Sequence, residues 1–416
     1  MAERKTPRRV VVVGAGMLGL ATAWHLQQRD IEVVVLDRSG VAAGSSWGNA
    51  GWISPGLAIP LAEPSVIKYG LKSLLDKNAA LYVPFKVDPK LWRFLLGFAR
   101  RCTMKAWRST MSHYVPVNRL AVDAYDELAA GGVSGKTHEA PIMAAFLTEA
   151  KAAGLVREID LIHEAGLELD TEVIDGDALR AELPIVSKDV ATAIRINGQR
   201  YIDPGDYVAS LAVAVQDRGG EIHSGASVRA LRQGPGGFTV EMYGGEPVRG
   251  DAVVLATGSW MPELAKQYGV NVPLRAGRGY SFSVAVDSPV PCPVYFPFER
   301  IACTPIGDRL RVAGTMEFRD VDAPLDMGRV DAIVENGRPL LSGVDWNDRH
   351  DVWVGGRPVT VDGLPLIGAT RNPDVYVAGG HGMWGITLGP LSGKLLAEQI
   401  ATGAVPDLLR PFDPTR

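Results

Sequence analysis

The sequence has little cysteine, little net charge and no long apolar run. Its 416 residues include three cysteines, Cys102, Cys292 and Cys303, which form neither a Cys-x-x-Cys pair nor a Cys/His cluster, so a disulfide framework or a zinc site is not expected. The formal net charge of −4 supplies no basic field for nucleic acid. No apolar run reaches the roughly 18 residues that a membrane-spanning helix needs. These absences favour an ordinary globular protein without a metal site, a nucleic acid partner or a spanning helix.

The N-terminus superficially imitates a signal peptide, because the basic residues 1–9 precede an apolar run. That run contains Gly14-Ala15-Gly16-Met17-Leu18-Gly19, however, and it reaches Trp24 and His25 without a small-residue cleavage site. We therefore expect a cytoplasmic protein. The chain is also longer than one hydrophobic core usually serves, which predicts two domains.

The first 37 residues carry the pattern of a βαβ unit. Residues 9–13 form a β-branched run, which is typical of a strand buried on both faces. A glycine turn follows, then an Ala/Leu-rich segment from Met17 to about Arg29 that is expected to be a helix. A second buried strand is expected from Ile31 to Leu36, directly before Asp37. This order of elements is typical of dinucleotide-binding folds.

The turn itself has the Gly-x-Gly-x-x-Gly spacing of a dinucleotide site. Gly14 would permit the tight turn, Gly16 the close approach of the backbone to a pyrophosphate, and Gly19 the close packing of helix on strand. Asp37 follows the second strand, where a carboxylate binds a ribose hydroxyl, and Arg38 is expected to lie over the adenosine. The candidate cofactor-binding residues of this unit are Gly14, Ala15, Gly16, Met17, Leu18, Gly19, Asp37 and Arg38.

Three further segments favour FAD over NAD(P) as the dinucleotide. Residues 44–55 are small and polar, so they suit phosphate contacts and a backbone beside a flat ring, with a surface loop as the alternative. Residues 255–258 form a small-residue turn after a buried strand, which a plain sheet-edge turn would also explain. Residues 379–390 place a glycine-rich loop before a helix, whose N-terminus would stabilise negative charge on a reduced flavin. The additional candidate cofactor-binding residues are Ser45, Ser46, Asn49, Ala50, Gly51, Trp52, Val228, Ala256, Thr257, Gly258, Gly356, Arg357, Gly380, His381, Gly382, Gly385, Ile386 and Thr387.

Segments with alternating strands and helices are separated along the chain by segments of other composition. This order predicts two interleaved domains. Residues 1–55, 201–262 and 355–416 have α/β character and are expected to assemble one Rossmann-like FAD-binding domain from discontinuous segments. Asp203-Pro204 would start a helix that runs to Arg218. The insertions, 56–200 and 263–354, mix helices with alternating strands and are expected to form an α+β substrate domain with a mainly antiparallel sheet.

Taken together, these segments resemble the D-amino-acid-oxidase-type FAD oxidoreductases, and most closely the bacterial D-amino acid dehydrogenase branch. The resemblance covers almost the whole chain. The segments that carry it, besides those above, are Ser54-Pro55-Gly56, Arg278-Gly279-Tyr280-Ser281, the strand from Arg309 to Gly314, Gly356-Arg357-Pro358, Asp362-Gly363-x-Pro365 and Gly380-His381-Gly382.

The resemblance implies oxidative deamination of a D-amino acid. In this family the Cα–H of a neutral amine is transferred as hydride to flavin N5, and the imino acid then hydrolyses to a 2-oxo acid and ammonia. The arginine that binds the substrate carboxylate maps onto Arg357. Because some relatives attach the flavin through a C-terminal cysteine and the last cysteine here is Cys303, non-covalent FAD is expected.

Further residues are candidates for the substrate site. Tyr280 and Tyr295 lie on strands expected to roof the pocket, where either hydroxyl is a candidate contact for the substrate carboxylate or amine, with an ordinary packed tyrosine as the alternative. His381 either tunes the flavin electrostatics or only shapes its loop. Trp52 and Trp384 either line the site or belong to the core, and Glu63 is a candidate partner for a cationic substrate side chain.

The electron acceptor stays open between a quinone, another carrier and O2. A run of basic residues around aromatic ones leaves open a contact with the inner face of an anionic membrane, although an ordinary amphipathic helix explains the same pattern. These residues are Lys86, Lys90, Arg93, Arg100, Arg101, Lys105 and Arg108, with Trp92, Phe94, Phe98 and Trp107.

Two other functions stay compatible with the sequence. The same fold oxidises other amines, such as hydroxy-D-proline, glycine, sarcosine or a pathway-specific amino acid. Alternatively, the chain is a non-catalytic protein that binds a dinucleotide, although simple binding needs no carboxylate-binding arginine. The sequence does not determine the oligomeric state.

Overall fold

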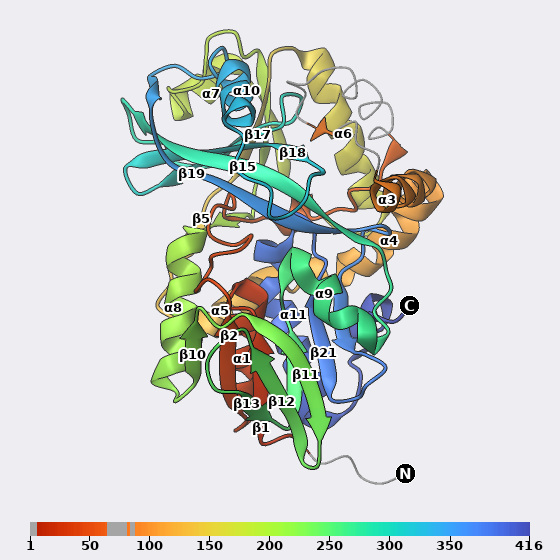
Figure 1. Ribbon diagram of the computed structural model, residues 1–416. Helices are drawn as coiled ribbons and strands as arrows, with labels where there is room; N and C mark the ends of the chain where they lie inside the picture. The colour runs from red at the N-terminus through yellow and green to blue at the C-terminus, as the bar shows by residue number, and fades with distance from the viewer. Residues whose placement is uncertain (1–5, 65–80, 84–87) are drawn as a thin grey trace.

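The computed structural model describes residues 6–64, 81–83 and 88–416. It contains two layers of sheet that lie one above the other, with helices packed around each (Figure 1). In the view of Figure 1 the lower layer carries the N-terminal strand and the last long helix, and the upper layer carries the longest strands.

The lower layer is a six-stranded sheet with the order β10-β2-β1-β14-β21-β20. Neighbouring strands pair in parallel except β20, which runs antiparallel to β21. The first strand lies where the β-branched run predicted it, and the second is shifted by one residue. The strands are β1 (Arg9–Val13), β2 (Glu32–Asp37), β10 (Glu221–Ser224), β14 (Ala252–Leu255), β20 (Leu366–Ala369) and β21 (Val375–Gly379).

Several helices pack against one face of this sheet, and two of those described, α4 and α5, come from the segment expected to serve the other domain. Helix α8 starts as predicted, since the Asp203 carboxylate caps it by accepting from the Gly205 N–H at 2.9 Å. Helices α4 and α5 bury their apolar residues in the same core as α1 and α11. The Tyr125 hydroxyl of α5, for example, donates to the Ile386 carbonyl of α11 at 2.7 Å. The helices are α1 (Met17–Gln27), α4 (Met104–Asn118), α5 (Ala121–Ala130), α8 (Pro204–Asp217) and α11 (Gly385–Thr402).

A row of glycines lets α11 lie directly against α1. Gly385, Gly389 and Gly393 recur every four residues, so they share one face of the helix. A Cβ atom on Gly393 would lie 2.7 Å from the backbone of Ala21 and Thr22. Close backbone contact of this kind fixes the position of the α11 N-terminus relative to the glycine turn.

The upper layer is a large mixed sheet with the strand order β19-β15-β18-β17-β16-β6-β8-β7, and β4 adds to β18. Among the described strands of this sheet, only the pairs β16–β6 and β18–β4 are parallel, which agrees with the mainly antiparallel sheet that the sequence predicts. The strands are β4 (Leu81–Tyr82), β6 (Ile142–Phe146), β7 (Thr171–Asp175), β8 (Thr192–Ile196), β15 (Leu274–Val286), β16 (Val294–Phe296), β17 (Ile301–Ile306), β18 (Arg309–Glu317) and β19 (Val344–Thr360).

The two faces of this sheet have different coverings. Helices α7 (Gly176–Glu182) and α10 (Met327–Gly337) cover one face with a core that includes Tyr280, Phe282 and Phe296. The other face meets α6 (Glu149–Glu164) and looks toward the lower layer (Figure 1). Because successive residues of a strand lie on opposite faces, one residue packs against α7 and α10 and the next faces α6 or the lower layer.

Smaller elements complete the described chain. Strands β11 (Val228–Gly234), β12 (Gly237–Met242) and β13 (Val248–Gly250) form one small sheet, and β3 (Trp52–Ile53), β5 (His138–Glu139) and β9 (Arg200–Tyr201) form another. Helix α3 (Pro89–Arg101) precedes α4, and α9 (Met261–Ala265) follows β14. Single turns of 3-10 helix are η1 (Pro55–Leu57), η2 (Gly258–Trp260), η3 (Lys266–Tyr268) and η4 (Asp407–Phe412).

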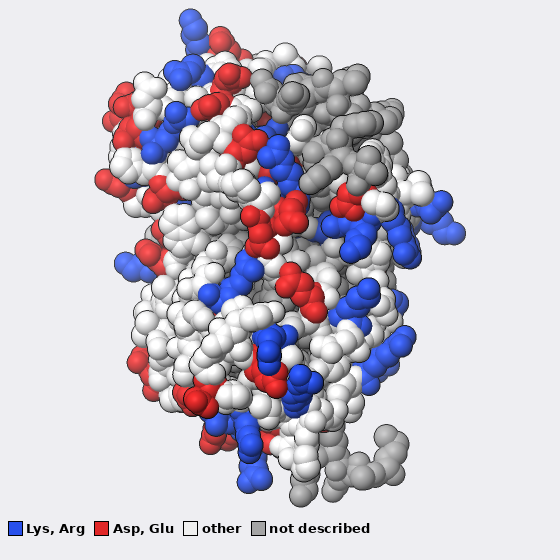
Figure 2. Space-filling view, viewed as in Figure 1, with Lys and Arg blue, Asp and Glu red and all other residues white. Residues whose placement is uncertain are grey.

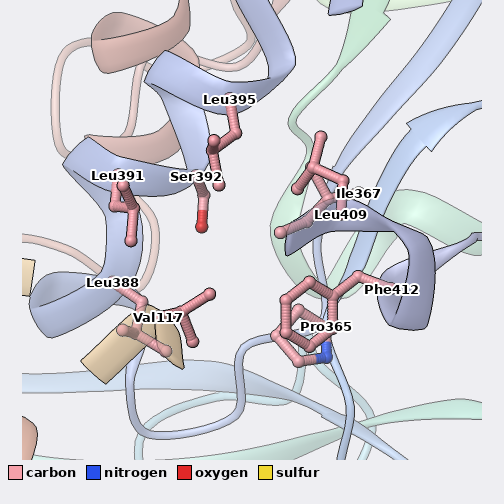
Figure 3. Close-up of a pocket in the computed structure, with 9 residues that line it drawn as sticks. All are labelled: Val117, Pro365, Ile367, Leu388, Leu391, Ser392, Leu395, Leu409 and Phe412. Atoms are coloured by element: carbon pink, nitrogen blue, oxygen red, sulfur yellow. The ribbon is translucent and has the colours of Figure 1, made fainter. Parts of the chain in front are cut away.

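A small apolar cavity lies between α11, β20 and η4 (Figure 3). Leu388, Leu391 and Leu395 point into it from α11, and Ile367 and Phe412 face them. Its volume of about 10 Å³ suits at most one water molecule, so it is a packing gap rather than a ligand site.

Across the described ranges, no helix is both long and apolar enough to cross a membrane. No three potential metal ligands cluster there either.

Candidate functional site

The glycine turn has the conformation that its spacing predicts. Gly14 has φ +116°, and a Cβ there would lie 2.4 Å from the Ala256 carbonyl oxygen. A Cβ on Gly19 would overlap the Gly14 carbonyl oxygen at 1.9 Å. Helix α1 begins directly after Gly16, so its free N–H groups open onto this turn. Gly14 and Gly19 thus lie where the chain has no room for a Cβ, and their roles toward a dinucleotide stay predictions.

Polar side chains from two neighbouring segments converge on the same turn. Asp37 accepts from the Ala15 N–H at 2.9 Å, while its other oxygen accepts from Ser39 and Gly40. The Ser46 hydroxyl lies at the α1 N-terminus, where it accepts from the Met17 N–H at 3.2 Å. The turn thus joins a carboxylate and a hydroxyl to helix N–H donors, a combination suited to the ribose and phosphates of a dinucleotide.

The turn after β14 contacts the glycine turn from the other side. The Ala256 N–H donates to the Val13 carbonyl at 2.8 Å, and the neighbouring Thr257 hydroxyl oxygen is buried without a hydrogen-bond partner among the described residues. Such an atom is costly unless a ligand or water satisfies it. Val228 lies at an irregular point of the β11–β12 pairing, and Gly258 has φ +54°.

Arg38 follows β2 and the glycine turn, and it contacts one residue from each layer, Trp260 and Asp322. Its guanidinium lies 3.8 Å from the Trp260 ring centroid and 3.1 Å from an Asp322 oxygen. The Trp260 indole N–H also donates to Asp322, at 3.1 Å. A position of Arg38 over the adenosine stays a prediction, and no local sequence pattern predicts its contacts with Trp260 and Asp322.

The polar segment after β2 is shaped by local hydrogen bonds. The Asn49 side chain accepts from the Gly51 N–H at 2.9 Å, and Gly51 has φ +81°. A Cβ on Gly51 would lie 2.2 Å from the Ile202 carbonyl oxygen. The Ser45 hydroxyl donates to the Gly356 carbonyl, so it joins the two layers instead of pointing freely at a phosphate.

The glycine-rich loop before α11 is equally constrained. Gly380 and Gly382 have φ of +74° and +55°, and the Gly382 N–H donates to the Pro358 carbonyl at 3.0 Å. Trp384 precedes α11, and its indole N–H donates to the Ile59 carbonyl at 2.8 Å. Thr387 donates to the Trp52 carbonyl at 3.0 Å and accepts from the Ser54 N–H, so its hydroxyl ties the two loops together.

His381 is a neutral, buried group. Burial lowers the pKa of its imidazole to about 3, and its Nε2 lies 2.9 Å from the Ser392 hydroxyl of α11. A charged role toward a flavin is therefore not supported. Of the two alternatives, the shaping of the loop fits this placement.

Arg357 lies on β19, on the face of the large sheet that looks toward the lower layer. Its guanidinium crosses the backbone of Gly279, where a Cβ atom would lie 2.3 Å from its central carbon. Its one hydrogen bond to the described residues goes from Nη1 to the Thr315 carbonyl at 3.2 Å, and none of their carboxylates forms a salt bridge with it. Protein encloses the guanidinium, and burial lowers its pKa to about 10, although the residue as a whole keeps some exposure.

The prediction for Tyr280 is wrong. Its side chain is 1% exposed and lies on the face covered by α10, where its hydroxyl donates to Glu317 at 2.6 Å. Glu317 also pairs with Arg278 at 3.0 Å. Tyr280 and Gly279 point to opposite faces of β15, so the tyrosine hydroxyl cannot share a pocket with Arg357.

Tyr295 lies on the face that Tyr280 does not. Its ring meets that of Trp52 edge-on at 5.5 Å, and both pack near Trp384. Burial raises the pKa of the Tyr295 hydroxyl, which hydrogen-bonds to Arg300 and interacts with Glu63. Trp52 and Tyr295 are therefore in ring contact, and Glu63 lies close enough to act on the charge of the Tyr295 hydroxyl.

The aromatic residues of α3 and α4 do not share one exposed face among the described residues. Phe94, Phe98 and Trp107 are buried, which leaves Trp92 as the exposed member, and Lys86 lies outside the described residues. Arg100, Arg101 and Lys105 instead line a groove of about 820 Å³ between α3, α4 and residues 361–364. Figure 2 shows several lysines and arginines on this side of the molecule, and others spread over the rest of the visible face.

Three polar residues of the large sheet bind a distant loop, a role that their local sequence does not predict. Ser281, Thr304 and Arg311 each bind a backbone carbonyl of residues 47–50. Polar residues at alternate positions of otherwise apolar strands could have indicated a binding role. That pattern does not show which loop the polar side chains contact.

Comparisons with known proteins agree with this geometry. A family model described as FAD dependent oxidoreductase matches residues 9–399. D-amino acid dehydrogenase of Methylobacterium nodulans is 31% identical over 409 residues, covering 96% of each chain. The enzyme of the same name from Xanthobacter autotrophicus is 30% identical, also over 96% of each chain.

A solved structure shares the fold along the whole chain. Glycine oxidase from Geobacillus kaustophilus superposes with a TM-score of 0.73 at 22% identity, covering 98% of this chain and 99% of that one.

Proposed function

Because this chain belongs to the family of FAD dependent oxidoreductases, we propose that it oxidises the Cα–N bond of a D-amino acid to an imino acid. The imino acid would then hydrolyse to a 2-oxo acid and ammonia. The name that its curated relatives carry, D-amino acid dehydrogenase, supports this choice of substrate.

The residues present fit FAD. The glycine cradle at Gly14 leaves no room for a Cβ, the α1 N-terminus offers free N–H groups, and the buried Thr257 hydroxyl has no partner among the described residues. FAD supplies the two-electron oxidation when it is bound. We propose that the cofactor is held without a covalent bond, because Cys102, Cys292 and Cys303 are all buried in the protein interior.

The observation that carries the proposed substrate class is the state of Arg357. A buried guanidinium stays protonated at neutral pH and is costly without an anion. No carboxylate of the described residues pairs with the Arg357 guanidinium, so its N–H groups stay available to a ligand. A substrate carboxylate suits this planar group because it can accept two parallel hydrogen bonds from it. Arg357 would thereby orient the amino acid, while Tyr295 and Trp52 shape the space beside it.

Substrate profiling tests the proposal. The purified enzyme is assayed with D-amino acids, their L enantiomers, glycine and sarcosine, using an artificial electron acceptor and then oxygen alone. We expect turnover of D-amino acids with the artificial acceptor. Turnover of sarcosine or glycine without any D-amino acid would contradict the substrate assignment, and a protein that no amine reduces would contradict the reaction.

A further inference from the structure

The segment that carries residues 47–50 is bound to the large sheet through its carbonyl groups. The Trp47 carbonyl accepts from Arg311 Nη1 at 2.9 Å, and the Gly48 carbonyl accepts from the Ser281 hydroxyl at 2.7 Å. The Ala50 carbonyl accepts from the Thr304 hydroxyl at 2.7 Å. Three side chains from three neighbouring strands thus hold nearly every carbonyl of this short segment.

The three donors form a built arrangement rather than incidental surface contacts. Arg311 lies directly opposite Thr304 in the β17–β18 register, and Ser281 lies on β15 beside them. Their exposed fractions are 4%, 0% and 1%. Arg311 is a buried cation, and its hydrogen bonds go to backbone carbonyls. No carboxylate of the described residues forms a salt bridge with it.

Holding the carbonyls fixes the direction of the N–H groups. In a trans peptide the C=O and N–H point in opposite directions. The peptides that Ser281 and Thr304 hold carry the Asn49 and Gly51 N–H groups, which already donate to the Ser46 carbonyl and to the Asn49 side chain. Arg311 Nη1 lies 2.9 Å from the Trp47 carbonyl oxygen and 3.5 Å from the Asn49 carbonyl oxygen, so these two peptides turn the N–H groups of Gly48 and Ala50 away from the guanidinium. Neither N–H donates to an acceptor among the described residues, and Gly48 is buried. Such donors require a ligand or water.

Contacts on the far side keep the same segment in place. The Thr304 hydroxyl also accepts from the Trp52 indole N–H at 2.8 Å. The Trp52 carbonyl is in turn held by Thr387 at the start of α11. The segment is therefore fixed between the large sheet and the glycine-rich loop of the lower layer.

We propose that Ser281, Thr304 and Arg311 are positioning residues that clamp carbonyls 47–50. Arg311 orients the Gly48 and Ala50 N–H groups toward bound FAD, and Ser281 and Thr304 fix the alternate peptides of the same segment so that those two N–H groups keep their position. The inference concerns the cofactor alone and holds whichever amine is oxidised. Fixed N–H donors stabilise negative charge, and flavin gains negative charge on reduction. The clamp therefore favours reduced FAD over oxidised FAD.

Redox titration of the holoenzyme tests the clamp. The variants are Ser281→Ala, Thr304→Val and Arg311→Gln, and the readouts are the two-electron midpoint potential and the dissociation constant of FAD. We expect each variant to weaken the binding of reduced FAD about tenfold relative to oxidised FAD, which lowers the potential by about 30 mV. Thr304→Ser should restore the wild-type value, because it keeps the hydroxyl.

Two control variants separate positioning from stability. Ser283→Ala changes a serine that is 2% exposed on the same face of β15 but forms no hydrogen bond with residues 47–50. Thr192→Val removes a buried hydroxyl that donates to the Ile174 carbonyl at 2.9 Å elsewhere in the sheet. Both should lower the thermal midpoint at most and leave the potential unchanged. If Ser281→Ala and Thr304→Val change only the thermal midpoint, as Thr192→Val does, the clamp has no role toward FAD.

Discussion

At the scale of single residues, the surroundings of a charged group decide what it can do. Arg357 and Arg311 are both enclosed arginines without a carboxylate partner among the described residues. Arg311 is committed to the carbonyls of a neighbouring loop, whereas Arg357 has one long hydrogen bond to Thr315. The difference leaves the Arg357 fork available to a substrate carboxylate.

Gly279 provides the space in which that fork lies, which gives a first prediction. Gly279→Ala would place a Cβ within 2.4 Å of three guanidinium atoms and displace them. Losing a charged, bidentate contact costs about 1.5–3 kcal/mol, so KM for the amino acid should rise roughly 10- to 100-fold. Steady-state kinetics measure this rise. Gly277→Ala, two residues along the same strand, contacts Met316 instead and should leave KM near its wild-type value.

Buried histidines make stability depend on pH, which gives a second prediction. Burial lowers the pKa of His25 from 6.5 to about 3, so the unfolded chain binds a proton between these values that the folded chain does not. The stabilisation from neutral His25 is complete above pH 6.5 and is lost as the pH falls toward 3. The free energy of unfolding should therefore decrease by about 1.4 kcal/mol per pH unit through this group.

Urea unfolding of wild type and His25→Gln across this pH range isolates the contribution. His381 has a similarly lowered pKa, and Glu158, whose pKa burial raises to about 7, acts in the opposite sense. Because both groups stay in the variant, only the difference between the two curves reports His25. Parallel curves would contradict the prediction.

At the scale of elements, local sequence patterns predicted where strands and helices begin. They did not predict which distant segments those elements contact. The β-branched run, the glycine spacing and the Asp-Pro helix start each specify a local conformation, and β1, α1 and α8 lie close to their predicted positions. The prediction for Tyr280 failed because the alternation of side chains along a strand shows only that neighbouring residues lie on opposite faces of the sheet. It does not show which of the two faces meets the lower layer. The roles of Ser281 and Thr304 depend on a loop more than 200 residues away, which no local pattern encodes.

The contact of α11 with α1 gives a third prediction. Gly393→Ala would force backbone atoms apart by adding a Cβ 2.7 Å from Thr22 N, and overpacking of this kind costs about 1–3 kcal/mol. Gly154→Ala is the matched control, because it lies within α6 with no atom within 4 Å of the new Cβ. That control should stabilise by about 0.5–1 kcal/mol, since alanine suits a helix better. Denaturant unfolding that shows equal effects at both positions would contradict close packing of α1 and α11.

At the scale of the whole molecule, the proposed site exists because two sheets face each other. The lower layer supplies the glycine turn and the α11 N-terminus, and the upper layer supplies Arg357 and the carbonyl clamp. The sequence predicted both sheets and their discontinuous origin from its alternating texture. It assigned all of residues 56–200 to one domain, whereas α4 and α5 pack with the lower layer, because an amphipathic helix does not reveal which core it joins.

The central claim is that Arg357 anchors the carboxylate of an amino acid that reduces bound FAD. Anaerobic mixing of the holoenzyme with a D-amino acid or with its decarboxylated amine, followed by flavin absorbance, tests it most directly. We predict rapid bleaching by the D-amino acid, none by the amine at equal concentration, and a 10- to 100-fold higher half-saturating concentration in Arg357→Lys. Equal bleaching by both compounds, or unchanged half-saturation in Arg357→Lys, would contradict the account.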